Sequence, residues 1–261
     1  MLTTGMRAEL AAELARAELD RVAVSPIVDR YPGIDVVDAY EVQLLNIRRR
    51  LDGGAKVVGH KVGLSSKAMQ QMMGVDEPDY GHLLADMEVF EDLPVDTSKF
   101  LLPRVEVEVG FVLGADLPGE DCTEADVLAA TVAYAPSIEL IDSRITDWKI
   151  GLADTISDNA ANAGIVTGGR PVKPDAVDLR WVGALLYKNG VIEETGLAAG
   201  VLNHPATGVA WLANKLAPWD EFLEKGEVVL GGSFTRPTAA VAGDCFHADY
   251  GPLGSIAFRF V

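Results

Sequence analysis

Residues 104–113 read RVEVEVGFVL, in which valines alternate with two glutamates. Successive side chains of a β-strand point to opposite faces of its sheet, so Glu106 and Glu108 share one face while Val105, Val107 and Val109 share the other. The alternation predicts a strand whose valine face is buried in a β-rich core. On these residues alone, the two glutamates are read as the solvated side of that strand.

A third glutamate changes this reading. Glu139 lies between Ile138 and Leu140 in a second strand-like segment, residues 137–142. If the two strands are neighbours, three carboxylates converge, and buried like charges persist only when protons or a cation neutralise them. Three carboxylate oxygens favour a hard ion such as Mg²⁺ or Mn²⁺, with positions left for substrate and water. Calcium is a weaker candidate because the chain has no DxDxDG loop.

Beyond these two segments, the apolar pattern predicts several further elements. Helical spacing predicts two amphipathic helices near the N-terminus, and Asp35 can cap the second of them. The Asn189-Gly190 pair favours a type I′ turn between two strands. Further strands are expected at residues 56–64, 163–168, 182–196, 227–233 and 254–260, further helices at 65–74, 123–135 and 203–217, with Asn203 capping the last, and a loop at 75–87.

Together these elements predict an α+β fold. We expect an N-terminal helical segment, residues 1–55, packed on a β-rich body, residues 56–261. No internal repeat or linker separates the two parts, so we expect one integrated unit.

Composition narrows the class of partner and the compartment. Twenty-two basic and thirty-nine acidic residues leave a net charge of −17, which disfavours binding to nucleic acid or to anionic membranes. The two cysteines, Cys122 and Cys245, suggest neither a disulfide framework nor a zinc site, and a reducing cytoplasm suits them. No apolar run has the length of a membrane span or the form of a signal peptide. We therefore expect a cytoplasmic protein that acts on a small molecule.

Six segments carry a family resemblance: GHKVGLSS (59–66), GVDEPDYGHLLADM (74–87), PRVEVEVGFVL (103–113), PSIELIDSRITDWK (136–149), DTISDNAANAG (154–164) and GDCFHADYGPLGSIAFRF (243–260). They resemble the 2-hydroxypenta-2,4-dienoate (2-keto-4-pentenoate) hydratases of the fumarylacetoacetate hydrolase superfamily, nearly end to end. We expect the nearest relatives among hydratases of steroid degradation. The resemblance implies a mixed-sheet body of the fumarylacetoacetate hydrolase type, a homo-oligomer, and a divalent metal held by Glu106, Glu108 and Glu139.

The resemblance also assigns roles to a lysine and an aspartate. Taken alone, Lys61 is read as a surface lysine. The resemblance implies that it takes part in acid/base catalysis, and desolvation beside a metal would lower the pKa of its amine. Asp79 is either a turn residue or, by resemblance, a group that transfers a proton or orients water. Ala161 stands where many relatives have a serine thought to contact substrate or water, so other donors would assist this site.

Three residues are candidates for contact with the substrate. Arg104 would pair with a substrate carboxylate or with a neighbouring glutamate. Ser233 and Thr235 lie in a segment that approaches the substrate carboxylate in relatives, although a plain turn explains them equally well.

The expected activity is that of a hydro-lyase. The enzyme would add water to a 2-hydroxy-2,4-dienoate, of the 2-keto-4-pentenoate or hexenoate type, and give a 4-hydroxy-2-oxo acid in aromatic or steroid meta-cleavage catabolism. One alternative is a decarboxylase of 4-oxalocrotonate-type 2-oxo-3-enedioates, whose dicarboxylate substrate needs a further cation near its far end. Another is a non-catalytic acidic module for binding or assembly. The addition of metal would not change the melting temperature of such a module.

Overall fold

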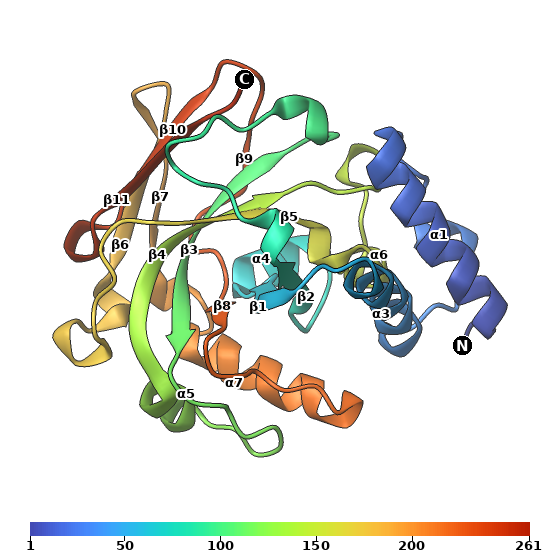
Figure 1. Cartoon of the computed structure of the whole chain (residues 1–261), viewed down its shortest axis with the longest axis horizontal. Coiled ribbons are helices and arrows are strands. Elements are labelled where there is room, and N and C mark those ends of the chain that lie inside the picture. The colour runs from blue at the N-terminus through green and yellow to red at the C-terminus, as the bar shows by residue number, and fades with distance from the viewer.

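A strongly curved mixed sheet of seven strands forms the body of the protein (Figure 1). The computed structural model describes the backbone of residues 1–261 and every side chain except those of Ala68, Met72 and Met73. Its strands are β1 (Val57–Gly63), β2 (Asp79–Leu84), β3 (Arg104–Leu113), β4 (Thr131–Ile141), β5 (Asn162–Thr167), β8 (Val228–Leu230) and β9 (Thr238–Ala239). Their order is β2-β1-β8-β3-β4-β5, with β9 beside β3, and only β1 and β8 pair in parallel.

The curvature brings the two ends of this sheet toward each other. Leu83 of β2 and Ile165 of β5 share one buried apolar cluster with Leu230 of β8. Glu88, just after β2, forms an isolated bridge with Ile165. The face that carries the glutamates of β3 is therefore enclosed, which excludes the solvated role that alternation alone suggested.

A second sheet of four antiparallel strands packs beside the first. Its strands are β6 (Gly183–Lys188), β7 (Val191–Leu197), β10 (Cys245–Asp249) and β11 (Ser255–Arg259), in the order β11-β10-β6-β7. Asn189 and Gly190 join β6 to β7 with φ angles of 53° and 80°. Both angles are positive, as a type I′ turn requires, so the predicted hairpin is confirmed.

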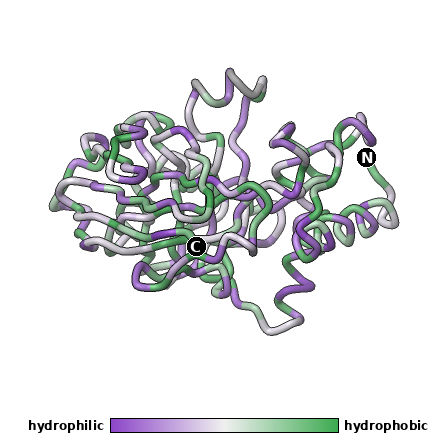
Figure 2. The backbone as a smooth tube through the Cα atoms, turned by 90° about the horizontal axis from the view of Figure 1, so that it is seen from above, coloured by the Kyte–Doolittle hydropathy of each residue, from purple (hydrophilic) through white to green (hydrophobic). Residues whose placement is uncertain are grey.

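The helices gather at one end and along one side of the sheets (Figures 1 and 2). They are α1 (Thr4–Asp20), α2 (Ile27–Arg30), α3 (Val36–Asp52), α4 (Lys67–Met73), α5 (Glu124–Ala130), α6 (Leu152–Ser157) and α7 (Pro205–Leu216). Leu10 and Leu14 on α1 are buried, and the Asp35 side chain accepts a hydrogen bond at the start of α3, as expected. The α+β class with a mixed sheet is confirmed. Over the residues that the structure describes, none of the helices is both long and apolar enough to cross a membrane.

Three local predictions were wrong. Residues 79–84 of the expected loop form β2, because a strand buried on both faces does not show the alternation of a half-buried one. The helix expected at residues 123–135 ends at Ala130, where pairing with β3 takes residues 131–135 into β4. His204, and not Asn203, caps α7. The strand β10 was not predicted.

Gln43 of α3 joins the N-terminal helices to the body. Its side-chain amide donates hydrogen bonds to the carbonyl oxygens of Tyr80, at 3.0 Å, and Ile156, at 2.7 Å. Asp154 of α6 accepts hydrogen bonds from the backbone N–H groups of Ile27 and Val28, at the start of α2. These buried bonds cross the boundary at residue 55.

We therefore expect the N-terminal helices and the body to unfold together. Replacing Gln43 with leucine leaves buried carbonyl groups without donors, which costs roughly 1–3 kcal/mol for each. The variant should have a lower melting temperature but still a single transition. Calorimetry and circular dichroism test this, and a separate early transition of the N-terminal helices would contradict it.

Candidate active site

Three glutamates meet on the enclosed face of the curved sheet. Glu106 of β3 lies directly opposite Glu139 of β4 in the antiparallel pair, and Glu108 follows on the same face of β3. One carboxylate oxygen from each residue lies within 4.8 Å of the others. The structure thus brings together the three predicted ligands, and their role in binding a metal remains a prediction.

Burial makes this cluster electrostatically unfavourable in the absence of a cation. Glu108 and Glu139 are fully buried, and Glu106 is partly exposed. Desolvation, reinforced by the charge of Glu139, raises the pKa of Glu106 to about 8 and that of Glu108 well above its usual value. Desolvation also raises the pKa of Glu139, against the opposing charge of Lys61. A divalent ion would relieve this repulsion directly.

The hydrogen bonds at the cluster leave particular oxygens free to bind a cation. Gly232 N–H donates to Glu108 Oε2 at 2.9 Å, and Asn162 Nδ2 donates to Glu139 Oε1 at 2.7 Å. The other oxygens, Glu108 Oε1 and Glu139 Oε2, are buried without a hydrogen-bond partner among the described residues, as is Asp79 Oδ1. Buried polar atoms are rarely left unsatisfied, and hard oxygen donors suit Mg²⁺ or Mn²⁺. The residues therefore fit such an ion.

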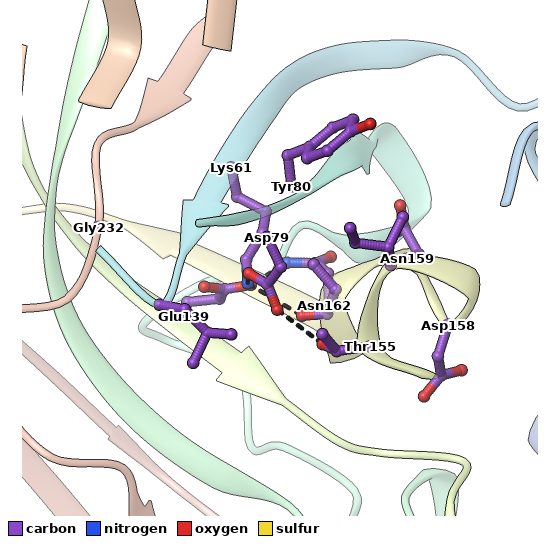
Figure 3. Close-up of polar contacts among 12 residues, drawn as sticks. Lys61, Asp79, Tyr80, Glu139, Thr155, Asp158, Asn159, Asn162 and Gly232 are labelled. Atoms are coloured by element: carbon purple, nitrogen blue, oxygen red, sulfur yellow. Dashed lines mark hydrogen bonds and ion pairs between the residues drawn. The ribbon is translucent and has the colours of Figure 1, made fainter. Parts of the chain in front are cut away.

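Lys61 is the cation that the chain itself places in this cluster (Figure 3). It lies on β1, is buried, and directs Nζ to Glu139 Oε1 at 3.3 Å and Asp79 Oδ1 at 3.8 Å. Nζ also donates a hydrogen bond to the Ala160 carbonyl at 2.9 Å. Burial lowers the pKa of Lys61, but the nearby carboxylates, Glu139 first, outweigh it and raise the pKa above its usual value. The expected lowering of the Lys61 pKa refers to an amine beside a bound metal ion and stays a prediction.

Asp79 is the first residue of β2 and faces Lys61. Its Oδ2 accepts a hydrogen bond of 2.7 Å from the Thr155 hydroxyl, which leaves Oδ1 as the free acceptor. Gly63 makes room for this pair, because a Cβ there would lie 2.2 Å from Asp79 Oδ1 and 2.8 Å from Lys61 Nζ. The aspartate belongs to a buried strand, which excludes the turn reading.

The segment between α6 and β5 contacts Lys61 through a backbone carbonyl group. Asn159, Ala160 and Ala161 have φ angles of 53°, 51° and 56°, a left-handed run that L-residues seldom adopt. Asn159 holds the run in place by exchanging two hydrogen bonds with the backbone of His82 on β2. The run points the Ala160 carbonyl at Lys61.

Sequence reasoning missed three contributors in this region: Thr155, Asn159 and Asn162. All lie in the segment 154–164, which the family resemblance marked, but in which only Ala161 attracted notice. Their polar side chains were the available signal. Which carboxylate or backbone group each one contacts is a matter of tertiary structure.

A cavity of about 270 Å³ opens beside the cluster. Lys61, Asp79, Glu106, Thr155 and Ala161 line it. Its remaining wall is largely apolar and includes Leu64, Met69, Ile141, Trp148 and Ile150. The cavity therefore presents proton-carrying groups and a glutamate of the cluster to a small organic molecule.

The candidate substrate contacts divide into two groups. Arg104 lines the cavity, with its guanidinium 4.3 Å from the centre of the Trp148 ring. The Ser233 hydroxyl donates to the carbonyl groups of Val107 and Thr235, and the Thr235 hydroxyl accepts from the Val107 N–H. Neither Ser233 nor Thr235 is among the described residues that line the cavity. Their contact with substrate remains a prediction.

Comparison with known proteins places these residues in context. No protein-family model matches the chain. The chain is 54% identical over 258 residues to the 2-oxo-hept-4-ene-1,7-dioate hydratase of Escherichia coli, with 97% of each chain covered. It is 38% identical over 259 residues to a 2-keto-4-pentenoate hydratase of Paraburkholderia xenovorans, covering 99% of this chain and 96% of the relative. It is 39% identical over 260 residues to a 4-oxalocrotonate decarboxylase of a Pseudomonas species, covering 100% of this chain and 98% of the relative.

Solved structures agree with the sequence comparison. The 4-oxalocrotonate decarboxylase of Pseudomonas putida G7, complexed with magnesium and adipate, superposes with a TM-score of 0.96 at 37% identity, covering 100% of this chain and 99% of that one. Fumarylpyruvate hydrolase of Pseudomonas aeruginosa, in complex with Mn²⁺ and pyruvate, has a TM-score of 0.61 at 17% identity, covering 77% of this chain and 88% of that one. The second likeness shows a shared fold alone.

Proposed function

Because the chain belongs to the family of 2-keto-4-pentenoate hydratases and 4-oxalocrotonate decarboxylases, whose fold is that of the fumarylacetoacetate hydrolase superfamily, we propose that it is a metal-dependent hydratase. The hydro-lyase adds water to a 2-hydroxy-2,4-dienoate and gives a 4-hydroxy-2-oxo acid. One observation carries the proposal: three glutamates, two of them with buried oxygens that lack a hydrogen-bond partner among the described residues, lie beside the Lys61–Asp79 pair, at a cavity that suits a small acid.

The overall reaction removes two protons from oxygen, delivers two protons to carbon and adds one hydroxyl group. The enol O–H at C2 loses its proton, and C5 gains one, so that the dienol becomes a 2-oxo-3-enoate. The oxygen of a water molecule then bonds to C4, water gives up one proton, and C3 gains one. The sum is addition of one water, so the enzyme needs groups that accept and donate protons but no oxidant or reductant.

Glu106, Glu108 and Glu139 would hold the divalent cofactor, Mg²⁺ or Mn²⁺. When bound, the ion polarises the C2 oxygen of a 2-oxo acid and stabilises negative charge on it. Neighbouring hydrogen bonds from Asn162 and Gly232 orient two of these carboxylates, Glu139 and Glu108, for such a role.

Lys61 and Asp79 are the proton-transfer groups of this proposal. The Lys61 ammonium carries three protons, of which one is donated to the Ala160 carbonyl, so protons remain for a carbon of the substrate. Asp79 Oδ1 has no hydrogen-bond partner among the described residues and is the available acceptor for a proton from the enol or from water. Thr155 holds the other Asp79 oxygen and thereby fixes the direction of Oδ1.

A decarboxylase is the second candidate, because one of the relatives bears that name. A second carboxylate on the substrate does not separate the two activities, since the Escherichia coli relative is named as the hydratase of a dioate. The product does separate them. The reading as a non-catalytic module loses support, because these relatives are named as enzymes.

The direct test is turnover of synthetic dienols with added Mg²⁺ or Mn²⁺. Ultraviolet absorbance should fall as the conjugated dienol is consumed, and mass spectrometry should find a product heavier by one water. Removal of the ion with a chelator should stop the reaction, and its return should restore it. Release of carbon dioxide from a 2-oxo-3-enedioate without a hydrated product would favour the decarboxylase instead.

Gly63 provides a test of the Lys61–Asp79 geometry. Replacing Gly63 with alanine places a methyl group 2.2 Å from the position of Asp79 Oδ1, so the pair must separate. We expect turnover to fall by roughly 100-fold, in line with the effect of displacing a catalytic group. The matched control is Gly33→Ala, because a Cβ at Gly33 meets nothing within 4 Å. Equal turnover in both variants would contradict the assigned geometry.

Finer expectations are also proposals. We propose that the enzyme forms a homo-oligomer, which sedimentation will test, and that it works in the cytoplasm, since the exposed Cys245 thiol is unpaired and suits a reducing compartment. A role in steroid degradation likewise remains a prediction, because none of the three relatives described above is named for it.

A further inference from the structure

The catalytic cavity carries positive charge beyond Lys61. Two arginines, Arg104 and Arg236, also line it, in a chain whose net charge is −17. Arg104 begins β3 and lies two residues before Glu106, so their side chains leave the same face of the strand. At about 3.4 Å per residue, their Cα atoms are roughly 7 Å apart along the strand. One wall of the cavity therefore presents a glutamate of the metal cluster and, further along, a guanidinium.

Arg104 is held in position but has no charged partner among the described side chains. Its guanidinium stacks over Trp148, whose indole N–H donates to the Leu102 carbonyl at 3.1 Å and so fixes the ring. Among the side chains that the structure describes, no carboxylate lies within 4.0 Å of the guanidinium, and the guanidinium donates no hydrogen bond to a described residue. Arg104 is only partly exposed. The N–H donors of the guanidinium are thus held in place and partly desolvated, and they have no acceptor among the described residues.

Arg236 differs on each of these points. Its side chain is 79% exposed, and its guanidinium already pairs with Glu194 at 2.7 Å. An exposed and paired arginine contributes mainly to the attraction of anions toward the opening of the cavity. Of the two arginines, Arg104 is therefore the one available for a direct contact.

We infer that Arg104 selects a dicarboxylate, the kind of substrate for which the Escherichia coli relative is named, by binding the carboxylate remote from the 2-oxo acid group. The inference rests on the proposed function, which places the 2-oxo acid end at the glutamate cluster. An alkyl end would cover the Arg104 guanidinium without satisfying its donors, whereas a carboxylate accepts two parallel hydrogen bonds from it. The apolar wall at Ile141 and Ile150 suits the carbon chain between the two acid groups.

Binding of unreactive saturated 2-oxo acids tests this inference without turnover. The probes are 2-oxoheptanedioate and 2-oxoheptanoate, which share the 2-oxo acid end and differ in the far carboxylate. Their affinities are measured by calorimetry with the full chain at saturating Mg²⁺. The wild type should bind the dioate about 10- to 100-fold more tightly, the range expected for hydrogen bonds to a charged group.

Substitution of Arg104 should remove this preference selectively. Arg104→Met retains an apolar stem over Trp148 and loses the charge, so it should weaken dioate binding by about 10- to 100-fold and change monoacid binding by less than about 2-fold. The control is Arg180→Met, the same loss of charge at an exposed residue outside the cavity, where both affinities should stay at the wild-type values. Melting temperatures of both variants verify folding.

The outcomes separate the inference from the function on which it rests. Equal binding of the two acids by the wild type, or an Arg104→Met variant that loses both acids alike, would overturn the inference alone. Failure of both acids to bind the wild type in the presence of Mg²⁺ would overturn the proposed function as well. Selective loss of dioate binding in Arg104→Met, with the control unchanged, would support the inference.

Discussion

Replacing Glu108 with glutamine is expected to abolish metal-dependent turnover while making the metal-free protein more stable. The amide oxygen can still accept the Gly232 N–H bond, but the residue no longer supplies a charged oxygen to a cation. Loss of groups that merely orient ligands weakens metal binding by roughly 10- to 100-fold, so removal of a ligand should cost about 100-fold or more. Turnover should fall by about 1,000-fold, the upper range for loss of one electrostatic stabiliser.

The gain in stability follows from the burial of the cluster. Glu108 is fully buried beside Glu106 and Glu139, and their repulsion contributes to its raised pKa. A neutral amide removes that repulsion, and we expect the free energy of unfolding to rise by about 1–3 kcal/mol without metal. Opposite signs for stability and activity are typical of a site whose strained charges serve function.

Calorimetric titration with Mg²⁺ and denaturant unfolding measure the two effects. At Mg²⁺ concentrations near 100 times the dissociation constant, the wild type should gain about 2.7 kcal/mol, and Glu108→Gln should gain almost nothing. The control is Glu193→Gln, an exposed glutamate on β7 that should change neither quantity. A Glu108→Gln variant that binds Mg²⁺ as tightly as the wild type would refute the role of the cluster in metal binding.

Replacing Lys61 with methionine is expected to remove turnover but not metal. Lys61 Nζ lies 3.3 Å from Glu139 Oε1 and competes with an ion for that carboxylate. Without the ammonium, Mg²⁺ affinity should equal or exceed that of the wild type. Turnover should nevertheless fall by about 100- to 10,000-fold, the range for loss of a positioned acid or base.

Stability provides a second signature of this variant. Without metal, Lys61→Met leaves the buried carboxylates of Asp79 and Glu139 without their cation, so the melting temperature should fall. Saturating Mg²⁺ should restore most of the loss, because the ion replaces the missing charge. Lys173→Met, at an exposed lysine, is the matched control. Weakened Mg²⁺ binding in Lys61→Met would show that the lysine maintains the metal site and is not a separate proton carrier.

Local sequence patterns were sufficient to predict those elements whose conformation depends on residues close together in the chain. Alternation of valine and glutamate determined strand β3, and the φ preferences of Asn189 and Gly190 determined the hairpin turn. The fully buried strand β2 escaped prediction because burial on both faces removes the alternation.

The candidate site divides in the same way. Residue types and family resemblance in the sequence were enough to nominate Glu106, Glu108, Glu139, Lys61 and Asp79. Only the tertiary structure decided that Thr155 and Asn162 orient two of these carboxylates, and that Glu139 and Asp79 lie close enough to Lys61 to raise its pKa. It also decided that Arg104 meets no carboxylate in the described part of the chain, while Arg236 pairs with Glu194. The reason is that burial and charge depend on neighbours distant in the chain, whereas strand and turn patterns depend on residues a few positions apart.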